Sequence, residues 1–146
     1  MHHRASTLLL ALLAALLCAC GSRGGSRTAP ATGAPSGQII ALCDTMSAPS
    51  GADTVRFGLM HSGEIAIKPL VLHNRTSHPL VLTGTTQHCG CVSLEYDPQP
   101  IQAGERRAVR LCFDARGLTG WQFKSIDLHV AGMPQAVRLY VDVEVE

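Results

Sequence analysis

The chain has 146 residues, and its 12 Lys and Arg nearly balance its 11 Asp and Glu. This balance argues against a protein that neutralises nucleic-acid phosphates, so no nucleic-acid partner is expected. The length allows one domain of ordinary size with additional segments. Only 4% of the residues are aromatic, so a core must consist mostly of Val, Leu and Ile.

The N-terminus is predicted to be a lipoprotein signal peptide, residues 1–19. A short basic start precedes an unbroken apolar run from Leu8 to Leu17. The run is too short for the roughly 20 residues of a membrane-spanning helix, and it has the layout of a secretory signal. Ala19 then precedes Cys20, as in the lipobox of bacterial lipoproteins, so we expect Cys20 to carry the lipid. A plain secretory peptide with a chance cysteine is the alternative.

Residues 20–37 are predicted to be a flexible tether. They are rich in Gly, Ser, Ala and Pro and contain no large apolar residue, so they cannot bury a core. Gly21, rather than an aspartate, follows Cys20, which favours the outer over the inner membrane of a Gram-negative cell. A lipid anchor followed by a tether predicts a domain held close to a membrane in the bacterial cell envelope.

The rest of the chain, residues 38–146, is predicted to be one all-β domain. Its apolar segments are short and separated by turn-rich sequence, and no window has a helical period over twelve residues. About seven strands are expected, with residues 38–43 as a candidate edge strand: 54–59, 64–74, 80–84, 92–96, 107–113, 122–130 and 137–145. This pattern predicts an antiparallel β-sandwich of two sheets, with a small barrel as the alternative.

One predicted strand has an irregular apolar pattern. Ile65 and Ile67 share a face, whereas Leu70 and Leu72 continue one position out of phase, with Pro69 at the change. A slip of one residue moves every side chain to the other face of a sheet. The pattern therefore predicts a bulge or a strand switch at Pro69, where proline is tolerated.

The densest group of reactive side chains is Cys89-Gly90-Cys91, which directly follows His88. Six cysteines are present, and four remain once the signal peptide and the lipidated residue are set aside: Cys43, Cys89, Cys91 and Cys112. An exported domain meets oxidising conditions in which disulfides persist. Four cysteines allow three pairings, and the sequence does not choose among them.

Three chemistries compete at this motif. The favoured one is a structural disulfide, either within the motif or from it to Cys43 or Cys112. Residues two apart in a straight strand lie nearly 7 Å apart, which is too far for a disulfide, so a bond within the motif requires a tight turn at the glycine. The second is a copper or zinc site made by Cys89, Cys91 and His88. The third is thiol–disulfide exchange, in which His88 raises the thiolate fraction of Cys89.

A series of short motifs recurs in an order found in a known family: Phe57-Gly58, Gly63-Glu64, Leu72-His73-Asn74, Pro79-Leu80, Cys89-Gly90-Cys91, Ala103-Gly104-Glu105, Phe113-Asp114 and Gly117 to Phe123. On these motifs, over about residues 55–131, the chain resembles domain-of-unknown-function family 1573. The resemblance implies an immunoglobulin-like fold in an exported protein or lipoprotein. Its wider relatives, the major-sperm-protein and cilium-associated modules, mostly bind other proteins. His88, Cys43 and Cys112 depart from the family pattern.

The resemblance implies no reaction, since the family has none assigned and a fold does not imply a function. The sequence contains no nucleophile elbow, phosphate loop, paired catalytic carboxylates or His-Glu-x-x-His motif. We therefore expect no enzyme activity and no resident cofactor. The predicted function is a binding or accessory module that engages another envelope protein or a polymer through a strand edge or loop end. The alternative is an envelope thiol or copper/zinc protein that uses Cys89, Cys91 and His88.

Overall fold

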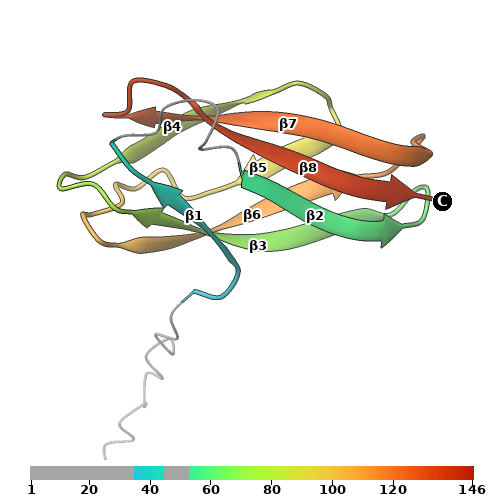
Figure 1. The fold of residues 1–146 in the computed structure, drawn as a ribbon, viewed down its shortest axis with the longest axis horizontal. Coiled ribbons are helices and arrows are strands. Elements are labelled where there is room, and N and C mark those ends of the chain that lie inside the picture. Colours follow the sequence, from blue (N-terminus) through green and yellow to red (C-terminus); the bar gives the residue numbers. More distant parts are fainter. Residues whose placement is uncertain (1–34, 45–52) are drawn as a thin grey trace, which may run out of the picture. The chain divides into compact units, whose positions relative to one another are not determined.

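A computed structural model describes residues 35–44 and 53–146. These residues form two four-stranded sheets that pack face to face (Figure 1). The strands are β1 Gln38–Leu42, β2 Asp53–Met60, β3 Ile65–Asn74, β4 Val81–Gln87, β5 Val92–Glu95, β6 Arg106–Asp114, β7 Gly120–Ala131 and β8 Val137–Val145. The predicted signal peptide, Cys20 and most of the predicted tether lie outside the described residues. Within those residues, no helix is long and apolar enough to span a membrane.

The strand order is β1-β3-β6-β5 in one sheet, here sheet A, and β2-β8-β7-β4 in the other, sheet B. The predicted all-β sandwich is confirmed. It has eight strands, because the candidate edge strand at 38–43 forms β1. The sheets are mixed, because β1 pairs with β3, and β2 with β8, in parallel. In both parallel pairs the connection passes through the other sheet: through β2 between β1 and β3, and through β3, β5 and β6 between β2 and β8. Neither pair is therefore joined by a hairpin. The immunoglobulin-like relationship stays a prediction.

The core lies between the two sheets and is mainly aliphatic. Along β8 every second side chain, from Val137 to Val145, is buried, and the residues between them face outward. Phe113 on β6 is the one aromatic side chain among the described residues that is completely buried. The period-two pattern of the sequence therefore gives the correct inner face for these strands.

The predicted bulge at Pro69 is wrong. Strand β3 pairs with β6 residue by residue from Ile65 to His73 without a register shift. Ile65 and Ile67 are 52% and 44% exposed on the outer face of sheet A, so the out-of-phase apolar residues occupy both faces of one regular strand. Proline is tolerated because β1 begins its pairing one residue later, at Leu70, so the outer side of β3 is unpaired at this point.

Two strands have a neighbour along only half of one edge. Strand β1 pairs with Leu70–Asn74 of β3, and no described strand pairs with residues 65–69 on that side. Strand β4 pairs with β7 from Ile126 to Ala131, and likewise no described strand pairs with residues 120–125 on that side. We call these segments the β3 half-edge and the β7 half-edge. They carry four of the six large exposed apolar side chains of the described chain: Ile65, Ile67, Trp121 and Phe123.

Gly37, the last residue of the predicted tether, already contacts the domain. Its φ is +150°, and a Cβ added there would lie 2.5 Å from the carbonyl oxygen of Pro69. Gly37→Ala is therefore expected to displace the start of β1 and to lower the free energy of unfolding by about 1–3 kcal/mol. Urea denaturation measures this. Gly84→Ala is the control, because a Cβ at Gly84 meets nothing within 4 Å, and an equal loss in both variants would contradict the prediction.

Candidate functional site

The Cys-Gly-Cys motif lies where the chain crosses from sheet B to sheet A, between β4 and β5. Cys89 and Cys91 form a disulfide with their Cα atoms 5.3 Å apart. Both are half-buried and pack against the core. The main-chain N–H of Asp114 donates a 2.9 Å hydrogen bond to the carbonyl oxygen of Cys91, which holds the end of the crossover against β6. Gly90 closes the ring without a positive φ, and a Cβ there would meet nothing within 4 Å.

His88 was predicted to act together with the two cysteines, but its ring contacts a carboxylate on β7 instead. Its Nε2 lies 3.1 Å from Oδ2 of Asp127 on β7. Asp127 also accepts two hydrogen bonds from Arg138 on β8, at 2.6 and 2.7 Å. The structure therefore brings His88 into a charged network on the outer face of sheet B, and not into a group with the two cysteines.

This network predicts a pH effect on stability. The hydrogen bonds from Arg138, with a smaller contribution from His88, lower the pKa of Asp127 to about 2. An unfolded aspartate titrates near pH 4. The folded state therefore binds fewer protons, and the stabilisation is present above about pH 4 and is lost as the pH falls towards 2. Wild type is expected to exceed Asp127→Asn in thermal midpoint at pH 6, and the difference should shrink by pH 2.5. A constant difference would contradict this origin.

Cys43 and Cys112 are free thiols and lie far apart on sheet A. Cys43 follows Leu42, which pairs with Asn74, whereas Cys112 pairs with Ile67. At about 3.3 Å per residue along β3, the two thiols are separated by more than about 20 Å. A disulfide requires Cα atoms within about 7 Å, so these two cysteines cannot pair within one chain of this fold.

The cysteine arrangement predicts a labelling pattern. Iodoacetamide added to the native protein without reductant should alkylate Cys43 and Cys112, while Cys89 and Cys91 remain unlabelled because their sulfurs are bonded. Peptide mapping by mass spectrometry reads this directly. Reduction before labelling is the control and should expose all four. Label on Cys89 or Cys91 without reductant would mean that the ring is open.

Three further histidines could bind a metal by residue type, but each has a different neighbour. His129 lies 2.6 Å from the Thr86 hydroxyl, and His78 lies 4.0 Å from a carboxylate oxygen of Asp44. His73 pairs across the ladder with Arg106. Across residues 35–44 and 53–146, no three His, Cys, Asp or Glu side chains gather as a metal site would require.

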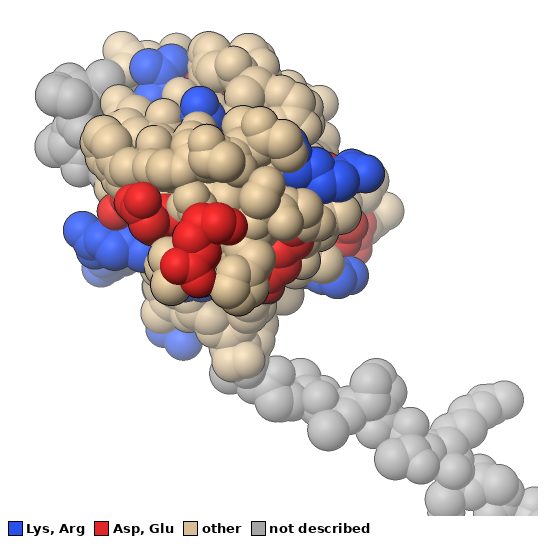
Figure 2. Space-filling view, turned by 90° about the vertical axis from the view of Figure 1, so that its right-hand side faces the viewer, with Lys and Arg blue, Asp and Glu red and all other residues tan. Residues whose placement is uncertain are grey.

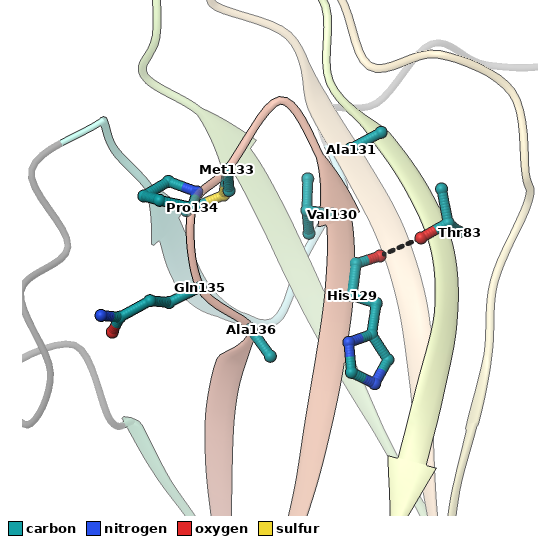
Figure 3. A pocket seen from close by; sticks show the side chains of 8 residues that line it. All are labelled: Thr83, His129, Val130, Ala131, Met133, Pro134, Gln135 and Ala136. Atoms are coloured by element: carbon teal, nitrogen blue, oxygen red, sulfur yellow. Dashed lines mark hydrogen bonds between the residues drawn. The ribbon is translucent and has the colours of Figure 1, made fainter.

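A shallow, open hollow of about 200 Å³ lies beside the turn between β7 and β8 (Figure 3). Its walls come from Thr83 and from the chain segment 129–136, including Met133 and Pro134. The Thr83 hydroxyl donates a 3.0 Å hydrogen bond to the carbonyl oxygen of His129. The lining contains no carboxylate, cysteine, lysine or arginine side chain. Thr83 and His129 both line it, but the Thr83 hydroxyl is bonded to the main chain of His129 and not to its imidazole, whose Nε2 lies 2.6 Å from the Thr86 hydroxyl.

Charged side chains on the described surface are largely paired. Figure 2 views the domain from the end at which β8 finishes and shows acidic and basic side chains in small separate groups on a broad uncharged surface. Asp114 is bound by Arg116, whose hydrogen bonds lower the pKa of Asp114 to about 2. Arg56 lies 3.5 Å from Asp142. This arrangement leaves apolar side chains, and not a single-sign charged patch, as the conspicuous feature of the surface.

A row of stacked rings on the outer face of sheet B was not predicted from the sequence. Trp121 and Phe123 of β7 are 66% and 46% exposed, and their ring centroids lie 5.8 Å apart. Phe123 in turn stacks on Tyr140 of β8 at 5.0 Å. The indole N–H of Trp121 donates a 2.8 Å hydrogen bond to Asp142. The alternation of Trp121 and Phe123 along the chain was the available signal.

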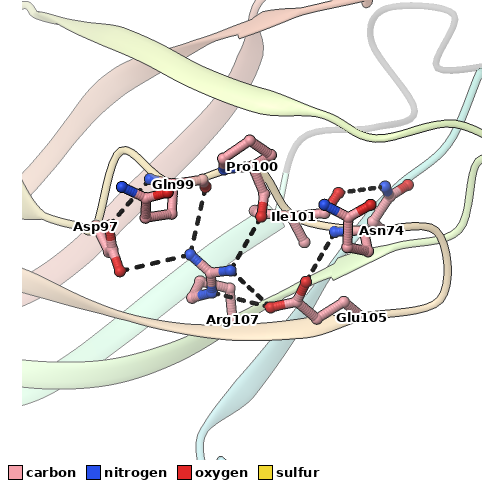
Figure 4. Close-up of polar contacts among 8 residues, drawn as sticks. Asn74, Asp97, Gln99, Pro100, Ile101, Glu105 and Arg107 are labelled. Carbon is pink, nitrogen blue, oxygen red and sulfur yellow. Dashed lines mark hydrogen bonds and ion pairs between the residues drawn. The ribbon is translucent and has the colours of Figure 1, made fainter.

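Sequence analysis also missed the structural role of Asn74. This side chain is completely buried and joins two loops (Figure 4). Its amide donates to the carbonyl oxygens of His78 and Ile101, at 2.8 and 2.9 Å. Arg107 holds the second loop from the other side, through Glu105 at 2.6 Å and the carbonyl oxygen of Pro100 at 3.1 Å. The described contacts of Asn74 and Glu105 therefore hold the two loops in place, and they give both residues a structural role.

A family model described as "Protein of unknown function (DUF1573)" matches residues 50–145. Among solved structures, a protein of unknown function from Porphyromonas gingivalis W83 is similar, with 19% identity, a TM-score of 0.55, and coverage of 64% of this chain and 44% of that chain. The VesB protease of Vibrio cholerae is also similar, with 17% identity, a TM-score of 0.51, and coverage of 63% and 30%. At these identities the likeness shows the fold alone, and the chain spans less than half the length of either structure. No curated protein matches the chain.

Proposed function

Since the chain belongs to the family of proteins of unknown function DUF1573, we propose that it is a non-catalytic, lipid-anchored module of the bacterial cell envelope. It binds another envelope protein or a polymer. The anchor is Cys20, and the folded domain is the binding part. The observation that carries the proposal is the β3 half-edge, a length of strand with an unpaired main chain and outward apolar side chains.

An unpaired strand edge presents main-chain N–H and C=O groups, which an added strand satisfies. Side chains on the outer face add specificity, because alternate residues of a strand face the same way. At the β3 half-edge these residues are Ile65 and Ile67. Ile39 of β1, 49% exposed, extends the apolar strip, since it pairs with Val71 further along the same strand.

The neighbouring edge of β2 differs because side chains cap its carbonyl groups. Gln38 donates a 3.1 Å hydrogen bond to the carbonyl oxygen of Thr54, and the Lys68 ammonium donates to that of Arg56. Such capping is a way in which proteins block unwanted strand pairing. Lys68 belongs to the β3 half-edge, and its side chain extends from there to β2. Since the described side chains donate no hydrogen bond to the main chain of residues 65–69, the contrast supports the β3 half-edge as the docking position.

Photo-cross-linking in the native envelope tests the binding proposal. A photoreactive residue at Ile65 or Ile67 should cross-link to the same partner, whereas one at Leu59, an exposed apolar residue of the capped strand β2, should not. Ile67→Lys should abolish the cross-link formed from position 65, and Leu59→Lys should leave it intact. Equal products from position 59, or no product from 65 and 67, would contradict the proposal. Palmitate labelling that is unchanged in Cys20→Ser would remove the anchor.

The competing function is an envelope thiol or copper/zinc protein, and it is favoured by the half-buried disulfide at the crossover. The double variant Cys89→Ser plus Cys91→Ser distinguishes the two functions. A three-residue loop closed by a disulfide contributes only about 1.6 kcal/mol through the unfolded state. A binding module should therefore lose no more than this stability and keep its cross-link at position 65. Loss of the cross-link in a folded double variant would favour the thiol or metal function.

A further inference from the structure

The β7 half-edge joins an open main chain to side chains that are exposed and yet held in place. Trp121 stacks on Phe123 and donates its indole N–H to Asp142. The ring planes of Trp121 and Phe123 are inclined by 24° and those of Phe123 and Tyr140 by 17°, with centroids 5.8 and 5.0 Å apart, as in the offset-stacked arrangement that aromatic pairs prefer. Because these side chains are already ordered, a binding partner would lose little further conformational entropy in contacting them.

The free main-chain groups of this segment match one class of partner, an extended polypeptide. Strand β8 pairs with β7 along one side from Gly120 to Leu128, while β4 pairs on the other side only from Ile126 onward. The free side of residues 120–125 offers main-chain donors and acceptors in the spacing of a β-ladder. An extended polypeptide matches that spacing.

The sequence of the segment is complementary to itself. In an antiparallel pairing about a two-fold axis, Phe123 lies opposite Phe123 of a second copy. On the outer face this register places each Trp121 indole opposite a small residue, Ser125. On the inner face it places Gln122 opposite Lys124, so no like charges meet. Aromatic pairs directly opposite one another favour a ladder, and like charges directly opposite would disfavour it.

Strand β4 also limits how far a second copy can pair along β7. Ile126 is already bound to Gln87 of β4, so a second copy can occupy β7 only up to Ser125. An isologous contact of this kind uses the same surface on both copies and closes after two. The half-edge therefore favours a dimer and not an open fibre.

We infer that two copies of this chain associate through their β7 half-edges, antiparallel about a two-fold axis at Phe123, so that sheet B continues from one copy into the other. This interface lies apart from the β3 half-edge and does not depend on the proposed binding function. In the dimer the β3 half-edge of each copy stays available.

Sedimentation velocity of the purified protein in reductant tests the inference, since reductant removes dimers linked through Cys43 or Cys112. We expect a concentration-dependent dimer whose formation blue-shifts the emission of Trp121, the sole tryptophan of the chain. Phe123→Glu places two carboxylates at the axis and should weaken association at least tenfold. Leu59→Glu, which changes a 62% exposed residue of β2, should not.

Phe123→Cys provides a second test that does not depend on the folding of the charged variant. Under mild oxidation it should form a disulfide-linked dimer through position 123, and Leu59→Cys should not form one through position 59. A monomer at all concentrations, or a dimer unaffected by Phe123→Glu, would overturn the inference. Either result leaves the cross-linking test of the β3 half-edge unchanged, because that test concerns a different partner and a different strand.

Discussion

Replacing Asn74 with alanine is expected to lower the free energy of unfolding by about 2–4 kcal/mol. The side chain makes four hydrogen bonds in a completely buried position. Its oxygen accepts from the main-chain N–H and the hydroxyl of Thr76, at 2.9 and 2.7 Å. Alanine leaves the main-chain N–H of Thr76 without its acceptor, and an unsatisfied buried polar group costs about 1–3 kcal/mol. The carbonyl oxygens of His78 and Ile101 each lose one of two donors and keep the Thr76 hydroxyl and the Leu80 N–H.

Urea denaturation measures the loss, and Thr76→Val is the graded control. Valine removes one hydroxyl but keeps the main-chain N–H that donates to Asn74. We expect a loss of about 1 kcal/mol in the free energy of unfolding, because the hydroxyl has one proton and donates it either to Asn74 or to the carbonyl oxygen of His78. A loss below 1 kcal/mol in Asn74→Ala, or a loss equal to that of Thr76→Val, would show that the two loops are held by other contacts, such as those of Arg107.

The case of Asn74 shows what the sequence could and could not predict. Turn chemistry after Asn74 was evident from composition, because Asn, Ser and Pro favour turns for local reasons. The bond from Asn74 to Ile101 spans 27 residues. No local pattern encodes a contact of that range, because it depends on how the β5–β6 loop packs after the sheets have formed.

The two half-edges were invisible for a related reason. Period-two alternation gives the face to which a side chain points, and it correctly separated inward from outward residues along β6, β7 and β8. The alternation does not show which strand pairs with a given strand, or over how many residues the two are paired. Ile65 and Ile67 were therefore explained by a bulge at Pro69, when the strand is regular and the two residues simply face outward.

The disulfide was one of several pairings that the sequence left open. A tight turn was correctly recognised as necessary for a bond between Cys89 and Cys91. The separation of Cys43 from Cys112 follows from the strand register, which places them near opposite ends of β3. His88 was assigned to the cysteines because it precedes them, but Asp127, 39 residues away, lies within hydrogen-bond distance of its ring.

Replacing Phe113 with alanine is expected to cost about 3–5 kcal/mol, the largest loss among these variants. Phe113 is completely buried between the sheets, in a core whose other completely buried side chains are aliphatic. Short aliphatic neighbours fixed on paired strands cannot move in to fill the volume of a lost ring, so most of the cavity should persist. The same strand holds the crossover, since Phe113 pairs with Val92 and Asp114 with the carbonyl oxygen of Cys91.

The matched control for this variant is Phe57→Ala, because the Phe57 ring lies 5.7 Å from that of Phe113 but is only partly buried. We expect about 1–2 kcal/mol for it, since less apolar area is removed from contact. Denaturant unfolding with an unchanged m-value gives both losses. Equal losses would mean that the core collapses around position 113 and that the sandwich is more plastic than its packing indicates. A much larger loss for Phe113→Ala than for Phe57→Ala would show that the least deformable part of the core is the part that contacts the crossover with Cys89 and Cys91.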